Sequence, residues 1–148
     1  MVGVSDGRMA LRMAGVLAAN GATRALVVHG SDGLDELTTT GLSTVVWQEG
    51  GSAQISTVDP AALGLAPATR EQLAGGDAVA NAASLRAVLD GAAGAHRDIA
   101  VLNAAAGLVA ARAATTFEDG VAQAQHSIDE GAAAAALDRL IATSTSTA

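Results

Sequence analysis

The residues best suited to chemistry are two adjacent carboxylates, Asp35 and Glu36, with Asp32 close by in the chain. They lie in a segment rich in Gly, Asp and Thr, residues 29–41 (HGSDGLDELTTTG), which follows an apolar run. Adjacent acids in a turn can direct their oxygens toward one cation, and such hard ligands suit Mg²⁺, which often bridges to substrate phosphates. From this spacing alone a solvated acidic loop is favoured, and a magnesium site at Asp35 and Glu36 is the alternative.

A second polar group is formed by Gly75, Gly76 and Asp77, followed by Asn81. A glycine-rich turn at a helix N-terminus can bind phosphate. An aspartate at the cap position would instead accept hydrogen bonds from the free N–H groups and repel an anion. We therefore favour a structural helix cap at this turn.

The remaining polar candidates are expected to be structural. Asn103 lies within an apolar helix, which favours a hydrogen-bonded core amide over a ligand. His29 closes a strand at the root of the acidic loop, where an orienting role is favoured over contact with a ligand. His96 and His126 have no partner at metal-ligand spacing, which indicates surface positions. No residue is predicted to act as a catalytic nucleophile, acid or base.

Composition excludes several classes of function. The 148 residues carry a net charge of -7 and include no Lys, no Cys and no Tyr, one Trp and one Phe. Without Lys there is no GxxxxGK[ST] phosphate loop, and no GxGxxG or HExxH motif occurs. An acidic chain with few aromatics does not favour nucleic-acid binding. Apolar runs fall short of membrane-spanning length and no signal peptide is recognised, so we expect a cytoplasmic protein that does not enter the membrane.

The elements that must position the acidic loop read as an α/β fold. Residues 2–4 and 24–28 are predicted strands on either side of a helix at 8–20 that Asp6 can cap. Strand, helix and strand over this length form a βαβ unit with parallel strands. Because ligands of open α/β sheets bind at the carboxyl ends of strands, the loop at 29–41 lies where a ligand is expected.

The rest of the chain is predicted to hold a hairpin and then helices. Strands at 44–48 and 54–58 are joined by a turn at 49–52, and 61–75 is a linker. The predicted helical features are a helix at 77–89, a largely buried helix at 96–113, an apolar stripe of Phe117, Val121, Ala124 and Ile128, a last helix anchored by Leu137, Leu140 and Ile141, and a frayed tail at 143–148. The expected fold is α/β: a partial α/β domain with a βαβ unit, a β-hairpin and several C-terminal helices packed on the sheet.

Four segments together resemble the anthranilate phosphoribosyltransferases. Residues 27–41 (VVHGSDGLDELTTTG) resemble the VHG-x-DGLDE-[IL] segment of that family, and 75–82 (GGDAVANA) resemble its GGD-x₃-NA segment. Residues 98–111 (DIAVLNAAAGLVAA) resemble its D-[IV]-x₂-LNAA-x₂-L helix, and 2–22 resemble the strand and helix before the first motif. The order and spacing of the motifs agree, so the resemblance covers essentially the whole chain.

The resemblance implies transfer of the phosphoribosyl group from phosphoribosyl pyrophosphate to anthranilate in tryptophan biosynthesis, with Asp35 and Glu36 holding Mg²⁺. It also implies that residues 1–148 are the C-terminal portion of the phosphoribosyltransferase α/β domain. The family's N-terminal helical domain, GTGGD phosphate loop, KHGNR-type basic segment and anthranilate-contacting Arg do not occur in this sequence. We expect little or no transferase activity from the isolated chain, and a separate N-terminal polypeptide could complete the site.

Two other interpretations stay open at this stage. The chain could be a non-catalytic remnant or binding module of the same fold. It could also be a related phosphoribosyltransferase or nucleoside-phosphorylase-like protein with another acceptor, since the acceptor-binding residues of the family are not found here. Retention of Asp35 and Glu36 within their loop favours the catalytic interpretation. The sequence makes no prediction of the oligomeric state.

Overall fold

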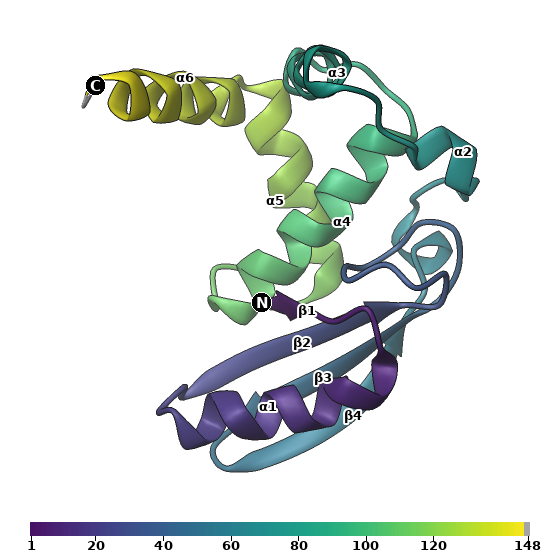
Figure 1. Ribbon diagram of the computed structural model, residues 1–148, viewed down its shortest axis with the longest axis vertical. Coiled ribbons are helices and arrows are strands. Elements are labelled where there is room, and N and C mark those ends of the chain that lie inside the picture. The colour runs from purple at the N-terminus through teal and green to yellow at the C-terminus, as the bar shows by residue number, and fades with distance from the viewer. Residues whose placement is uncertain (147–148) are drawn as a thin grey trace.

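The computed structural model describes residues 1–146, in which a sheet of order β1-β2-β3-β4 carries helices on its two faces (Figure 1). The elements in chain order are β1 (Val2–Gly3), the 3-10 turn η1 (Gly7–Met9), α1 (Ala10–Ala19), β2 (Arg24–Gly30), β3 (Ser43–Glu49), β4 (Ser52–Val58), the 3-10 turn η2 (Ala61–Leu63), α2 (Arg70–Leu73), α3 (Ala78–Leu89), α4 (Ala95–Ala110), α5 (Phe117–Asp129) and α6 (Ala132–Thr145). The predicted α/β class is confirmed.

The βαβ unit at the start of the chain is confirmed. Strand β1 pairs in parallel with β2, with Val2 opposite Val27, and α1 connects the two strands. The predicted cap is also present, because a carboxylate oxygen of Asp6 accepts a hydrogen bond of 3.0 Å from the backbone N–H of Arg8. This cap begins the 3-10 turn η1, which leads directly into α1.

The predicted hairpin is confirmed, with strands slightly longer than expected. Strand β3 is antiparallel to both β2 and β4, and Glu49 pairs with Ser52. The two residues between them, Gly50 and Gly51, have φ angles of 58° and 83°. Two successive positive φ values match the twist of the flanking strands, and they are conformations that glycine adopts at little cost.

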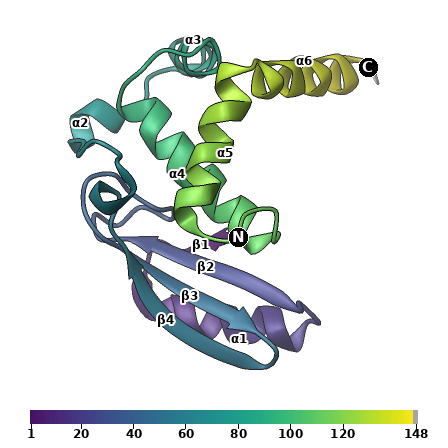
Figure 2. The same ribbon diagram turned by 180° about the vertical axis from the view of Figure 1, so that it is seen from behind.

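The sheet is buried on both faces along β2. The side chains of Leu26 and Val28 belong to a core shared with α4 and α5, whereas Val27 packs with Ala10 and Ala14 of α1. Figures 1 and 2 show α1 on one face of the sheet and the helices α4 and α5 on the other. A strand covered on both sides explains the nearly continuous apolar run that leads into the acidic loop.

Helix α5 turns its predicted apolar stripe toward α4. The members of that stripe that are buried are Val121, Ala124 and Ile128, and Phe117 packs partly buried beside them. The two helices approach closely because Gly120 lies at their contact, where an added β-carbon would come within 2.9 Å of the Ala105 carbonyl oxygen. The middle of α4 is largely buried as predicted, although Ala104 is exposed.

The predicted last helix is present as α6 and Leu137 is half-buried in it, but the predicted anchoring by Leu140 and Ile141 was wrong. Leu140 is 65% exposed and Ile141 is 42% exposed, and α6 contains no buried residue. Figures 1 and 2 show α6 extending away from the sheet. Ala133, near its start, packs partly buried against the core, whereas Leu140 and Ile141 lie further along the helix and remain exposed. The predicted frayed tail was also wrong for residues 143–145, which continue α6, while 147–148 lie outside the described residues.

The stretch at 61–75 is more ordered than the predicted linker. It contains η2 and the short helix α2. The side chain of Thr69 accepts a hydrogen bond from the backbone of Gln72, and the Gln72 side chain accepts one of 2.8 Å from the Thr69 N–H. This reciprocal capping box fixes the start of α2 and therefore the position of Arg70, its first residue.

Candidate functional site

The loop at 31–42 leaves the carboxyl end of β2 and returns as β3, which confirms the predicted location. Its base is closed by backbone hydrogen bonds from Gly30 N–H to Leu34 O (2.9 Å) and from Ser31 N–H to Leu42 O (3.1 Å). Figure 1 shows the loop extending beyond the sheet toward α2. The acidic residues are thus carried by a loop with a closed base.

Asp32 organises the interior of this loop. One carboxylate oxygen accepts hydrogen bonds of 2.8 Å from the hydroxyls of both Thr38 and Thr40, and the other accepts one of 3.2 Å from the Leu34 N–H. Burial opposes ionisation of this carboxyl, but the hydrogen bonds outweigh it and lower the pKa of Asp32. Because its oxygens are used within the loop, Asp32 acts as a structural anion.

Asp35 and Glu36 differ from Asp32 because their carboxylates are uncommitted. Within the part of the chain that the structure describes, neither side chain makes a hydrogen bond or an ion pair. Asp35 is exposed, whereas Glu36 is half-buried. Burial raises the pKa of Glu36, and repulsion from Asp35 and Asp32 raises it further. A bound cation would relieve this crowding of negative charge.

A cavity of about 420 Å³ lies beside the acidic residues. The residues that line it are Asp32, Leu34, Glu36, Arg70, Leu73, Ala74 and Ile99. Glu36 therefore faces the cavity, while Asp35 is not part of its wall. Among the described residues of the lining, Arg70 is the one basic side chain, and its guanidinium donates a hydrogen bond to the backbone carbonyl oxygen of Asp32. The cavity thus combines carboxylates, one guanidinium and an apolar side.

Asn103 of α4 anchors the loop next to Glu36. Its side-chain oxygen accepts a hydrogen bond of 2.9 Å from the Leu37 N–H, and its amide nitrogen donates to the Leu37 carbonyl oxygen at 2.8 Å. The same nitrogen donates to the Ile99 carbonyl oxygen at 3.0 Å. The predicted hydrogen-bonded amide is confirmed, and its partner is the acidic loop, 66 positions away in the chain.

His29 has the predicted orienting role. Its ring Nδ1 donates to the Val4 carbonyl oxygen at 2.8 Å, and the ring lies against Gly7, where an added β-carbon would come within 2.8 Å of it. The contact fastens the end of β2 to the connection between β1 and η1. His29 is therefore committed to holding the strand ends together.

The Gly75-Gly76-Asp77 turn is a helix cap, as favoured from the sequence. A carboxylate oxygen of Asp77 accepts a hydrogen bond of 2.8 Å from Ala80 N–H at the start of α3. Asn81 accepts from the Gly76 N–H at 2.8 Å and donates to the Gly76 carbonyl oxygen at 3.0 Å. An added β-carbon at Gly75 would lie 2.8 Å from Asn81, which explains the small residue there. The motif is therefore a helix cap in which Asn81 is hydrogen-bonded to both the N–H and the carbonyl oxygen of Gly76.

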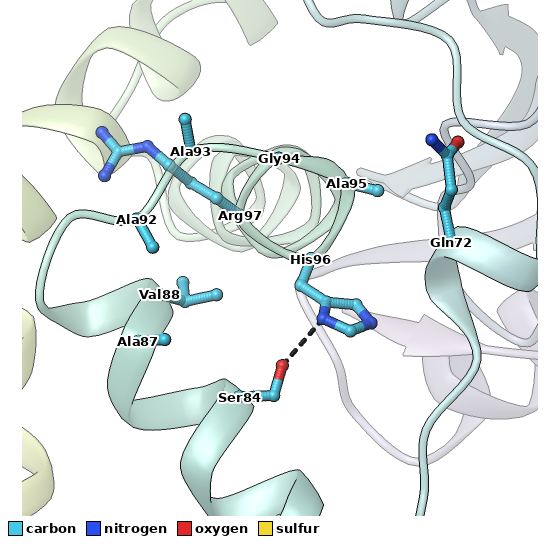
Figure 3. Close-up of a pocket in the computed structure, with 10 residues that line it drawn as sticks. All are labelled: Gln72, Ser84, Ala87, Val88, Ala92, Ala93, Gly94, Ala95, His96 and Arg97. Atoms are coloured by element: carbon cyan, nitrogen blue, oxygen red, sulfur yellow. Dashed lines mark hydrogen bonds between the residues drawn. The ribbon is translucent and has the colours of Figure 1, made fainter.

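A second pocket, of about 340 Å³, lies at the start of α4 (Figure 3). His96 is half-buried and hydrogen-bonded through Nδ1 to the hydroxyl of Ser84 at 2.7 Å, so it is less exposed than the predicted surface position. His126 is exposed, as predicted. Figure 3 shows Arg97 turned away from His96, and it pairs with Asp129 at 2.7 Å. Among residues 1–146, no carboxylate lines this pocket to activate the Ser84–His96 pair.

The acidic loop fits a magnesium ion by the chemistry of its donors. No group of three or more His, Cys, Asp or Glu side chains within residues 1–146 is arranged to hold a metal. Mg²⁺ in phosphate-binding sites is usually held by one or two carboxylates, with substrate phosphates and water completing its coordination. Asp35 and Glu36 meet this requirement, and the assignment of the metal to them stays a prediction.

Sequence reasoning missed the wall of the cavity opposite the loop. Arg70 and Ile99 lie 34 and 63 positions after Glu36, and no pattern in the sequence connects them to it. The Thr69-x-x-Gln72 capping box was the available signal for α2, but it does not reveal what α2 contacts.

No helix within residues 1–146 is long and apolar enough to cross a bilayer.

Comparison with known proteins agrees with this architecture. Residues 1–134 match the glycosyl transferase family, a/b domain. The chain is 55% identical over 144 residues to an anthranilate phosphoribosyltransferase of Methylobacterium nodulans, covering 97% of this chain and 43% of that protein. A relative of the same name from an Arthrobacter species is 55% identical over 147 residues, covering 95% of this chain and 42% of its own length. The chain therefore spans less than half the length of the curated relatives it matches.

Solved structures of similar proteins share the fold. The crystal structure of anthranilate phosphoribosyltransferase from Thermus thermophilus superimposes with a TM-score of 0.85 at 38% identity, covering 95% of this chain and 41% of that one. The enzyme from Saccharomyces cerevisiae in complex with PRPP and Mg gives a TM-score of 0.87 at 23% identity, covering 97% of this chain and 42% of that one. The yeast enzyme has also been solved with 4-fluoroanthranilate, with a TM-score of 0.86 at 24% identity. At 23% and 24% identity, the similarity to the two yeast structures concerns the fold alone.

Proposed function

The chain belongs to the glycosyl transferase family, a/b domain, and from that premise we propose that it supplies the magnesium-holding loop of an anthranilate phosphoribosyltransferase. The reaction would transfer the phosphoribosyl group from phosphoribosyl pyrophosphate to anthranilate, in the cytoplasm and within tryptophan biosynthesis. The observation that carries the proposal is the pair of uncommitted carboxylates Asp35 and Glu36, of which Glu36 lines a cavity of about 420 Å³.

The charge of the loop suits a cation and repels an anion. Burial raises the pKa of Glu36, and repulsion from Asp35 and Asp32 raises it further. The same negative charges would repel a diphosphate that approached the loop directly. Asp35 and Glu36 would hold Mg²⁺, and Asp32 would keep the loop in shape through Thr38 and Thr40. Bound Mg²⁺ would neutralise charge on the diphosphate leaving group.

The cavity supplies little other positive charge. Arg70 is the only basic residue of its lining, and the whole chain carries a net charge of -7. Phosphoribosyl pyrophosphate is highly anionic, so its phosphates require more donors than these residues offer. We propose that further basic groups reach the substrate from other polypeptide, either covalently continuous with this chain or separate, and that the 148 residues alone turn over slowly or not at all.

Titration of the purified chain with Mg²⁺, followed by NMR of the Glu36 and Leu37 amides, tests the proposal. We expect saturable shifts in the wild type and their loss in Asp35→Asn/Glu36→Gln. The matched control is Glu118→Gln/Asp119→Asn, which removes the same charge from another adjacent acidic pair at the start of α5 and should leave Mg²⁺ binding intact. Phosphoribosyl pyrophosphate added with Mg²⁺ should give further shifts.

A wild-type chain that does not bind Mg²⁺, or a control pair as damaging as the loop pair, would refute the proposal. Either result would leave a fold of this family without the metal function, that is, a non-catalytic remnant or binding module. Addition of other amines with the completed site would separate anthranilate from another acceptor, because only the true acceptor should release pyrophosphate at an appreciable rate.

A further inference from the structure

The Asn103 amide forms a two-point clamp on a single residue of the acidic loop. It accepts from the N–H and donates to the C=O of Leu37, at 2.9 Å and 2.8 Å. The N–H belongs to the peptide unit that joins Glu36 to Leu37, and the C=O belongs to the next unit. Both peptide planes around Leu37 are therefore fixed by one side chain on α4.

The clamp is itself held in place. The Asn103 amide nitrogen also donates to the Ile99 carbonyl oxygen one turn earlier in α4, at 3.0 Å. This third hydrogen bond orients the amide, so its oxygen and nitrogen cannot exchange places without loss of contacts. The Leu37 side chain is fully buried in the core shared by the sheet, α4 and α5, which holds the other side of the residue.

Glu36, directly before this fixed residue, faces the cavity and has no hydrogen bond or ion pair of its own within residues 1–146. Its carboxylate position must therefore come from its backbone, which the clamp controls. We propose that Asn103 is a positioning residue that aims Glu36 into the cavity and thereby sets the affinity of the loop for Mg²⁺. This inference rests on the proposed function.

The experiment compares Asn103→Ala with the wild-type chain and with Val121→Ala, a buried α5 residue that does not contact the loop through hydrogen bonds. Mg²⁺ titrations are followed by the Glu36 amide shift, and hydrogen exchange is measured at the Leu37 amide. We expect Asn103→Ala to raise the Mg²⁺ midpoint about tenfold, the lower end for an outer-shell partner, and to lose protection at Leu37. Val121→Ala should lower the melting temperature while keeping the wild-type midpoint.

The outcomes separate the two proposals. If the wild type binds Mg²⁺ and Asn103→Ala binds it equally well, the role of Asn103 is overturned while the proposed function stands. If Val121→Ala shifts the midpoint as much as Asn103→Ala, the effect is one of stability and the role is again overturned. If Asn103→Ala does not fold, hydrogen exchange of the wild-type chain is the test. A wild-type Leu37 amide that exchanges as fast as an exposed loop amide would exclude the clamp. A wild type that fails to bind Mg²⁺ refutes both proposals.

Discussion

The backbone carbonyl oxygen of Asp35 lies directly over Gly3 of β1, so that a β-carbon built on Gly3 would come within 1.5 Å of it. The acidic loop therefore rests on the first strand, and only a residue without a side chain leaves room for it. This contact joins the start of the chain to the candidate metal ligands, which are more than thirty residues away in the sequence.

Replacement of Gly3 by Ala should displace the loop. Overpacking of this kind costs about 1–3 kcal/mol, and we expect a weaker response to Mg²⁺ together with a lower melting temperature. Thermal unfolding and Mg²⁺ titration of Gly3→Ala give the two measurements. Gly15→Ala is the control: no atom lies within 4 Å of the added β-carbon in α1, so it should stabilise the chain by about 0.5–1 kcal/mol. Equal behaviour of the two variants would contradict the close contact.

Replacement of Asp32 by Asn should loosen the loop from inside. The charged acceptor for Thr38 and Thr40 is lost, which costs about 1–3 kcal/mol of unfolding free energy. The effect should depend on pH. Because the folded state lowers the pKa of Asp32, the carboxylate stabilises the fold fully above the usual aspartate pKa of about 3.9 and loses this effect as pH falls through the lower folded value. Unfolding curves of the wild type and Asp32→Asn should therefore converge in acid. A constant difference down to low pH would exclude the ionic role.

Replacement of Glu36 by Gln should separate stability from metal binding. The folded state raises the pKa of Glu36, so the carboxyl favours folding below its usual pKa of about 4.3, and this contribution is lost as pH rises through the folded value. At neutral pH, Glu36→Gln should stabilise the metal-free chain, because the neutral amide avoids both the burial of a charge and the repulsion from Asp35 and Asp32, while weakening Mg²⁺ binding. Denaturant unfolding with and without Mg²⁺ measures both effects. A variant that is destabilised without metal would be inconsistent with a charge held unfavourably by burial and repulsion at Glu36.

Replacement of Asn81 by Ala tests whether the Gly75-Gly76-Asp77 motif has a role in binding. Two hydrogen bonds to Gly76 are lost, at a cost of about 1 kcal/mol for this exposed turn. Because the motif is a helix cap and not a binding site, the Mg²⁺-induced shift of the Glu36 amide should not change. Melting temperature and the Mg²⁺ midpoint are the measurements, and Asp77→Ala should behave in the same way through the lost cap of α3. A shifted midpoint would assign the turn to the site.

The sequence predicted the parts of the fold that depend on local signals. Asp6, the Gly50-Gly51 turn and Asp77 each act on neighbours within a few residues, so their types alone identify the cap or the turn. The apolar stripe of α5 was correct because α5 has a neighbour to pack against. The same pattern misled at Leu140, since periodicity shows that a helix has an apolar face without showing whether anything covers it.

The sequence could predict which residue types form the candidate site, but not which residues contact one another there. The carboxylates of Asp35 and Glu36 could be named from their loop, and Asn103 could be recognised as a polar group that needs partners. The partners themselves depend on tertiary structure, because Asn103 meets Leu37 from 66 positions away and Arg70 meets Asp32 from 38 positions away. Contacts over such distances arise from the packing of α2 and α4 beside the sheet, which no short motif describes.

Because of its internal hydrogen bonds, the acidic loop loses its conformational entropy when the chain folds and not when a cation binds. Thr38, Thr40 and Leu34 all donate to Asp32, so the loop is already ordered by folding itself. A cation that reaches Asp35 and Glu36 then meets a preorganised backbone and need not order the chain on arrival. The rate of association at this loop should accordingly be limited by the dehydration of the ion and not by ordering of the chain.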